Sequence, residues 1–147
     1  MVTNRTRNDV EALLQVAREK EPFLVAPFTC AINTGMRRGE ILGLRWEDIG
    51  ADRIRVQRAL LRGHITTTKS GRSREIPISK PLRHVLDELR SQLSPWEEPS
   101  YVFLSPKGKR WDERNFARAF DRLRPKAHKA EKVRPLHFHC ARHTFAS

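Results

Sequence analysis

The stretch of sequence that decides the fold is Thr34–Ile49, which reads TGMRRGEILGLRWEDI. Gly35 follows an apolar segment and marks the expected end of a helix, because glycine readily adopts the left-handed conformation that closes helices. A second, short helix is expected over residues 40–46. The segment therefore predicts two helices joined by a tight turn, and this turn carries Arg37 and Arg38.

Helices are also expected on either side of this segment. Apolar residues recur at helical spacing over about residues 9–19, 81–93 and 113–128. Residues 23–32 are almost entirely apolar and predict a buried helix. Residues 1–8 are polar, and we expect them to form a flexible N-terminal segment.

Between these helical segments, apolar and polar residues alternate along the sequence. Residues 53–57 and 74–78 alternate as half-buried strands do, and a further extended stretch covers about residues 61–68. Pro77 has no N–H to donate, which favours an edge position for the last strand. The sequence thus predicts an α+β domain, mostly helical, with a small three-stranded antiparallel sheet.

The composition is strongly basic. The 147 residues include 29 Lys plus Arg against 17 Asp plus Glu, a net charge of +12. A folded domain of this charge is expected to bind a polyanion, and nucleic acid is the leading class. Cys30 and Cys140 form no CxxC pair, which gives no sign of a disulfide framework. No signal peptide or membrane-spanning stretch is recognisable, so we expect a cytoplasmic protein with no membrane partner.

Two short segments carry cations in positions suited to phosphate chemistry. Arg37 lies in a helix-to-helix turn, which could aim its planar fork at a phosphate, and Glu40 could hold or orient it. Lys69 lies at the tip of a hairpin, Thr68–Arg72, and could enter a DNA groove or donate a proton to a leaving oxygen. Taken alone, the arginine pair is equally compatible with solvated surface charges, and Lys69 is better explained as a solvated lysine in a turn.

The C-terminal segment, residues 139–147, combines an imidazole with a guanidinium. His139 and Arg142 are three positions apart, so in a helix they share one face. His139 and His143 are four apart, which also suits zinc. No carboxylate or further Cys/His pair at ligand spacing accompanies them, and Arg142 would repel a cation. A phosphate is therefore favoured over a metal ion.

Together, these segments resemble the catalytic domain of the tyrosine recombinases, the phage integrase family. Residues 34–49 match the first arginine box of the family, residues 68–71 stand where the family places its lysine, and residues 139–145 match its HxxR box. The resemblance covers about residues 9–147. It implies the tyrosine-recombinase catalytic-domain fold, of the DNA breaking-rejoining type. It also implies site-specific recombination or integration by a phage or mobile element, through a 3′-phosphotyrosyl intermediate.

The resemblance further implies a role for each matching residue. Arg37 and Arg142 would clamp the scissile phosphate and stabilise its charge in the transition state. Lys69 would act as the general acid that protonates the leaving 5′ oxygen, and His139 would assist proton transfer. The supporting residues would be Glu40 and His143. The family acts on double-stranded DNA as a tetramer and needs no metal or other cofactor.

The chain also departs from the family pattern. The family nucleophile is a tyrosine that follows the second arginine, whereas the only tyrosine here is Tyr101, in a stretch that matches a structural part of the family. Ala141 stands where the family usually has a larger apolar residue. We therefore expect residues 9–147 to be a partial catalytic domain, monomeric in solution, that holds the phosphate site without the nucleophile. The alternatives are a non-catalytic DNA-binding remnant of a recombinase gene and an unrelated basic nucleic-acid-binding protein.

Overall fold

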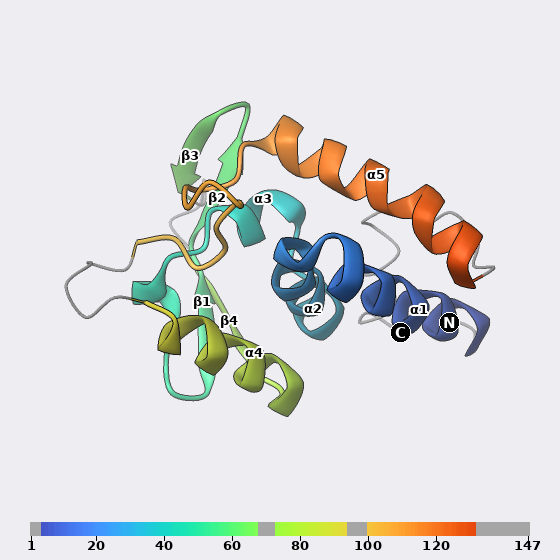
Figure 1. The fold of residues 1–147 in the computed structure, drawn as a ribbon. Coiled ribbons are helices and arrows are strands. Elements are labelled where there is room, and N and C mark those ends of the chain that lie inside the picture. Colours follow the sequence, from blue (N-terminus) through green and yellow to red (C-terminus); the bar gives the residue numbers. More distant parts are fainter. Residues whose placement is uncertain (1–3, 68–72, 94–99, 132–147) are drawn as a thin grey trace.

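The structure is a computed structural model that describes residues 4–67, 73–93 and 100–131, with the backbone alone for residues 4–9 and 124–131. Its helices are α1 (Asn4–Lys20), α2 (Val25–Thr34), α3 (Arg38–Leu42), α4 (Lys80–Ser91) and α5 (Glu113–Glu131), with short 3-10 helices η1 (Pro22–Leu24) and η2 (Trp46–Asp48). Its strands are β1 (Arg53–Val56), β2 (Arg58–Leu61), β3 (His64–Thr67) and β4 (Arg74–Pro77). The predicted α+β architecture dominated by helix is confirmed (Figure 1).

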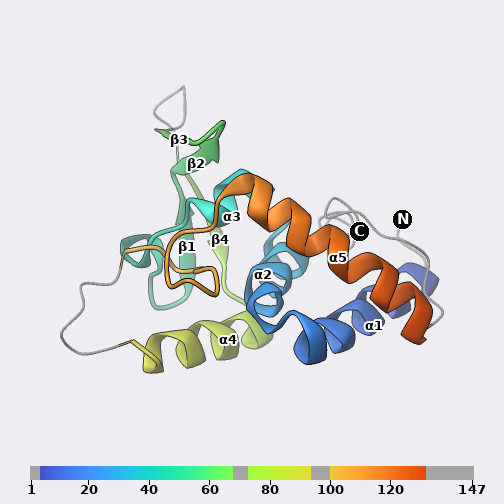
Figure 2. The same cartoon turned by 45° about the horizontal axis from the view of Figure 1, so that its top comes forward.

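The described strands form two antiparallel pairs, which corrects the predicted three-stranded sheet. β1 pairs with β4, and β2 pairs with β3. Figure 2 shows the β2–β3 ribbon projecting beyond the end of the β1–β4 pair. The stretch predicted as one strand over residues 61–68 contains a reversal, because Arg62 and Gly63 adopt φ angles of 50° and 80°. A two-residue turn with positive φ at both positions matches the twist of the strands it joins.

The apolar segment predicted as one helix is divided into η1 and α2. Pro22 begins η1, and Pro27 lies in the first turn of α2, where its missing N–H removes no helical hydrogen bond. α2 ends at Thr34, and Gly35 follows with a φ of 70°, as predicted. α1 begins at Asn4, earlier than the apolar periodicity indicates.

The helices enclose the apolar core between them. α1 packs along α5, and α2 packs on α4 (Figure 1). The rings of Phe28 and Phe120 join α2 to α5 with a centroid separation of 5.8 Å. Cys30 is fully buried, as predicted, and this burial raises the pKa of its thiol to about 12. The thiol is therefore neutral and belongs to the core.

The short helix α3 lies directly against the backbone of β2. A Cβ atom on Gly39 would lie 2.4 Å from the carbonyl oxygen of Leu60, closer than any real contact allows. A Cβ atom on Gly43 would lie 3.2 Å from the amide nitrogen of the same residue. Two glycines one turn apart thus permit a backbone-to-backbone contact that fixes α3 on the β2–β3 ribbon.

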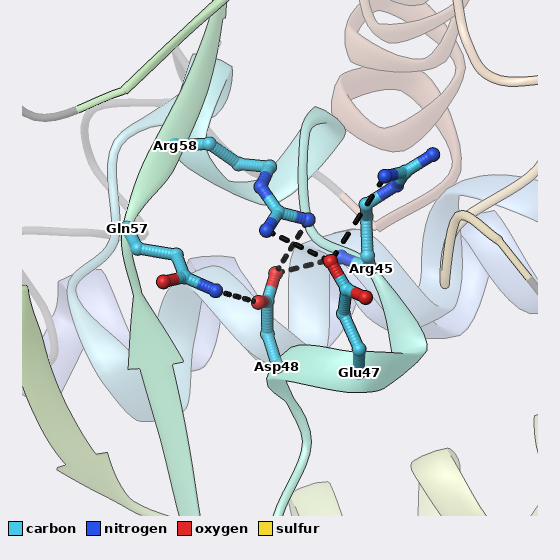
Figure 3. Close-up of polar contacts among 5 residues, drawn as sticks. All are labelled: Arg45, Glu47, Asp48, Gln57 and Arg58. Atoms are coloured by element: carbon cyan, nitrogen blue, oxygen red, sulfur yellow. Dashed lines mark hydrogen bonds and ion pairs between the residues drawn. The ribbon is translucent and has the colours of Figure 1, made fainter.

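A buried carboxylate joins the segment after α3 to the strands (Figure 3). The Asp48 side chain is 1% exposed and accepts hydrogen bonds from the Arg45 backbone N–H at 3.1 Å and from Gln57 Nε2 at 2.6 Å. Arg58 Nη1 lies 3.4 Å from Asp48 Oδ2, within ion-pair range but without hydrogen-bond geometry. Arg58 Nη2 donates to the exposed Glu47 at 3.0 Å. The cluster therefore fixes η2 against the start of β2.

We expect Gly39→Ala to lower the free energy of unfolding by about 2 kcal/mol, because the added methyl would overlap the Leu60 carbonyl. Urea unfolding followed by circular dichroism measures this change. The control is Arg38→Ala at the neighbouring exposed position, for which we expect less than about 0.5 kcal/mol. Equal effects of the two substitutions would contradict the close approach of α3 to β2.

We expect Asp48→Asn to lower the free energy of unfolding by about 2 kcal/mol, because the largely buried Arg58 guanidinium would lose its buried anionic partner. The matched control is Glu47→Gln, since Glu47 contacts the same arginine from an exposed position. Its cost should stay below about 0.5 kcal/mol. Thermal unfolding of both variants is the measurement, and a larger effect at Glu47 would refute the assignment of Asp48 as the central group.

Candidate functional site

The turn between α2 and α3 holds the backbone on either side of Gly35 in place. Thr34 is buried, and its Oγ1 donates to the Cys30 carbonyl at 2.6 Å and accepts from the Met36 N–H at 3.1 Å. The Met36 side chain is fully buried in the core. Arg37 follows in an extended conformation, with φ −73° and ψ 153°, as the N-cap of α3. The position of the Arg37 backbone is therefore set by the core.

Glu40 contacts Arg37 through the backbone. The Arg37 N–H donates to Glu40 Oε1 at 2.8 Å, as in one half of a helix capping box. The other half cannot form, because a guanidinium accepts no hydrogen bond. The Arg37 side chain is exposed, and no carboxylate among residues 10–67, 73–93 and 100–123, whose side chains the structure describes, lies within ion-pair distance of it. Glu40 thus holds the main chain of Arg37 and leaves its guanidinium free of a described acidic partner.

The guanidinium that Glu40 does bind belongs to Arg74, at the start of β4. Arg74 Nη1 donates to Glu40 Oε2 at 2.7 Å and Nη2 donates to Oε1 at 2.9 Å, a bidentate pair. Burial alone would raise the pKa of Glu40. The hydrogen bonds from Arg74 and from the Arg37 N–H, with the charges of both arginines, outweigh burial and hold that pKa below its ordinary value of 4.5. Glu40 is therefore an ionised carboxylate at neutral pH.

Arg74 is the residue that our reading of the sequence missed. It lies 34 positions from Glu40, so no local motif links the two. Their contact arises from the placement of α3 and from the pairing of β4 with β1, in which Arg74 stands opposite Val56. The only local signal was the basic residue at the first position of a predicted strand, and this signal is too common to identify a site.

A groove of about 600 Å³ lies between α3, the β2–β3 ribbon and α5. Arg37 and Arg38 line it from α3, and the buried Leu60 and Phe116 line it from β2 and α5. Glu113, also in the lining, accepts the Gly63 N–H at 2.8 Å and so joins α5 to the β2–β3 turn. The lining therefore combines two guanidinium-bearing residues with an apolar wall and with the carboxyl-bearing residues Glu40, Glu113 and Asp121, so only its arginine side is suited to an anion such as a phosphate.

The remaining predicted site residues lie outside the described residues. These are Lys69, His139, Arg142 and His143. The structure thus brings together Arg37 and Glu40 from the predicted set. In the part of the chain that the structure describes, no group of three or more His, Cys, Asp or Glu residues could hold a metal ion. No helix there is both long enough and apolar enough to cross a membrane.

Tyr101 is placed by contacts with two arginines. The guanidinium carbons of Arg45 and Arg110 lie 5.1 and 5.5 Å from the centroid of its ring, within cation–π range. The backbone of Tyr101 forms an isolated β-bridge with that of Arg45. The ring is half-buried and does not line the α3–α5 groove. Tyr101 therefore occupies a structural position away from Arg37.

Comparison with known proteins shows the family of the chain. The profile of the phage integrase family matches residues 4–147. Among curated relatives, the shufflon-specific DNA recombinase of Escherichia coli is 39% identical over 83 residues, covering 55% of this chain and 19% of that protein. The tyrosine recombinase XerC-like protein of Caldanaerobacter subterraneus subsp. tengcongensis is 29% identical over 84% of this chain and 38% of that protein. The chain thus spans less than half of the length of each of these relatives.

Solved structures show the same fold. A structure of the Tn1549 transposon integrase in complex with circular intermediate DNA has a TM-score of 0.81 and 22% identity, over 98% of this chain and 52% of that chain. The XerA recombinase has a TM-score of 0.71 and 23% identity, over 95% and 46%. A lambda integrase dimer bound to a COC′ core site has a TM-score of 0.69 and 20% identity, over 95% and 49%. The chain belongs to the phage integrase family, the tyrosine recombinases, and has the fold of their catalytic domain.

Proposed function

We propose that this chain supplies the phosphate-binding part of a catalytic domain for site-specific recombination of double-stranded DNA. In the full-length protein, the reaction would proceed through a 3′-phosphotyrosyl intermediate on a DNA-bound tetramer. Arg37 and Arg142 would bind the scissile phosphate, Lys69 would protonate the leaving 5′ oxygen, and His139 would assist proton transfer. His143 would support the histidine–arginine pair.

The observation that carries this proposal is the state of Arg37. Its backbone is fixed by the core and by Glu40, while its guanidinium is exposed beside a groove with no described carboxylate in ion-pair range. A phosphate site needs such a cation, held in position but without an anionic partner of its own, because pairing within the protein would compete with the substrate. The net charge of +12 adds the long-range attraction that DNA binding requires.

A second candidate function is DNA binding without strand cleavage by the 147-residue chain. It is favoured by the position of Tyr101, which is the only tyrosine of the sequence and does not line the groove that contains Arg37. The first candidate requires a tyrosine hydroxyl as nucleophile, whereas the second requires only the cationic surface. Both candidates predict DNA binding, and they differ in whether a covalent bond to DNA forms.

We expect the chain to bind duplex DNA weakly, with an affinity that falls steeply as salt rises. Arg37→Ala should weaken binding by about fivefold and reduce the slope of log affinity against log salt by about 0.9, because one phosphate contact is lost. Fluorescence anisotropy with a labelled duplex at several salt concentrations measures both. The control is Arg18→Ala on α1, which removes one positive charge outside the groove. The one described hydrogen bond of the Arg18 side chain is to Gln15. If the two substitutions have the same effect, Arg37 has no special part in binding.

We expect no covalent adduct when the purified 147-residue chain is incubated with a nicked suicide substrate. The physical reason is that the Tyr101 ring contacts Arg45 and Arg110 and does not line the groove, whereas attack requires a hydroxyl in line with a phosphate bound at Arg37. Denaturing gel electrophoresis detects such an adduct directly. An adduct that disappears in a Tyr101→Phe variant would overturn our assignment of this tyrosine, and one that persists would reveal a different nucleophile.

A further inference from the structure

One carboxylate oxygen at the edge of the α3–α5 groove serves two arginines at once. Glu40 Oε1 accepts from the Arg37 backbone N–H at 2.8 Å and from Arg74 Nη2 at 2.9 Å, while Oε2 accepts from Arg74 Nη1 at 2.7 Å. The Glu40 side chain is 12% exposed and that of Arg74 is 49% exposed. The contact thus joins the first residue of β4 to the N-cap of α3, and only its Arg74 side is open to solvent.

Removal of Arg74 would leave Glu40 with a different choice of partner. A carboxylate that is mostly buried needs a cation nearby, and besides Arg74 the cation whose charge acts on Glu40 is the Arg37 guanidinium, three positions earlier in the chain. If the Glu40 side chain rotated toward that guanidinium, the carboxylate would neutralise the charge of Arg37. The hydrogen bond from the Arg37 N–H would then be lost. Arg74 prevents both changes by occupying both oxygens with a rigid fork.

We infer that Arg74 is a positioning residue for phosphate binding: it holds the Glu40 carboxylate away from the Arg37 guanidinium and so keeps that guanidinium free for a phosphate. This inference rests on the proposed function, since it concerns the same site. It assigns Arg74 no contact with DNA of its own. The effect of Arg74 on DNA binding must therefore act through Arg37.

A double-mutant cycle on DNA affinity tests this dependence. The proteins are the unsubstituted chain, Arg74→Gln, Arg37→Ala and the double variant, and the probe is a short labelled duplex at low salt. We expect Arg74→Gln to weaken binding by about fivefold when Arg37 is present and by less than about twofold when it is absent, as for residues within one network. Equal losses in both backgrounds would make Arg74 an independent DNA contact and overturn the inference. No loss in either background would overturn it as well.

A matched control is available on the same pair of strands. Arg55 on β1 forms an exposed ion pair with Glu75 on β4, with an N–O distance of 3.8 Å. Arg55→Gln therefore removes one positive charge and one surface ion pair from the same pair of strands. We expect it to change DNA affinity by the same small factor with and without Arg37, because no carboxylate links it to that residue. Coupling to Arg37 as strong as that of Arg74 would overturn the inference, since it would trace the effect to general charge.

The NMR shift of the Arg37 backbone amide proton distinguishes a positioning role of Arg74 from a merely structural one. This proton bonds to the Glu40 carboxylate, so its NMR shift should follow the protonation of that group as the pH is lowered. In the unsubstituted chain the midpoint should lie below 4.5, and in Arg74→Gln it should rise, because burial then acts with less opposition. Arg74→Lys, which keeps the charge without the fork, should give an intermediate midpoint and partial recovery of affinity. An unchanged midpoint in both variants would overturn the inference.

Thermal stability supplies the folding check and has a defined pH dependence. Because the pKa of Glu40 is lower in the folded state than its ordinary value of 4.5, its pairing stabilises the fold above that pH and is lost as the pH falls through the lower value. The difference in melting temperature between the unsubstituted chain and Arg74→Gln should therefore be present at neutral pH and vanish in acid. If Arg74→Gln does not fold, the double-mutant cycle is measured with Arg74→Lys in its place.

The failures can be told apart. If the unsubstituted chain shows no DNA binding at low salt, the proposed function falls and the inference falls with it. If the chain binds but Arg37→Ala binds equally well, the role proposed for Arg37 fails. If Arg37→Ala weakens binding and the cycle is additive, only the inference about Arg74 is wrong.

Discussion

The rest of the structure depends on how closely α3 approaches the backbone of β2. α3 has only five residues, too few to be stable as an isolated helix, so its position comes from its neighbours. Gly39 and Gly43 allow it to lie directly against Leu60, where a side chain at position 39 would collide with the strand and one at position 43 would be tightly packed. This contact places the N-cap of α3 at the edge of the groove shared with α5. A methyl group at Gly39 would force this edge away from β2, and with it the arginine that the edge presents.

Three carboxylates connect the elements around this contact, and each accepts a backbone N–H from a turn or helix start. Glu40 accepts from Arg37, Asp48 accepts from Arg45, and Glu113 accepts from Gly63. Two of them, Glu40 and Asp48, also pair with an arginine of a strand. Each of these two pairs takes up one basic side chain for one acidic side chain, so they leave the excess of 29 basic over 17 acidic residues unchanged.

The sequence predicted those features that depend on short-range patterns. Helical periodicity identified the main helices, and Gly35 identified the end of α2, because a left-handed residue is a local requirement. The turn at residues 62–63 was missed, since arginine followed by glycine is not a typical hairpin signal and the stretch around it is apolar and β-branched. The partner of Glu40 was missed for a different reason. Arg74 reaches Glu40 because of the register between β4 and β1 and the packing of α3 on β2. Neither can be predicted from residues that are neighbours in sequence. The contact between Arg37 and Glu40 was predicted because it is local. The roles of these two residues in phosphate binding remain predictions, as do those of Lys69, His139, Arg142 and His143.

An arginine that must meet a phosphate poses a particular problem for a fold. A long side chain is most easily held by pairing its charge, but a guanidinium paired within the protein is less available to a ligand. Here the backbone of Arg37 is restrained, and not its guanidinium. Thr34 and Met36 hold the chain before Arg37, and Glu40 accepts a hydrogen bond from its N–H. This arrangement would fail if the holding carboxylate were free to turn to the guanidinium beside it. A second arginine, drawn from a distant strand, occupies that carboxylate. Among the described residues, the absence of a carboxylate partner at the Arg37 guanidinium therefore depends on Glu40 and Arg74 together. The two arginines cannot exchange roles, since only Arg37 has its backbone anchored at the groove.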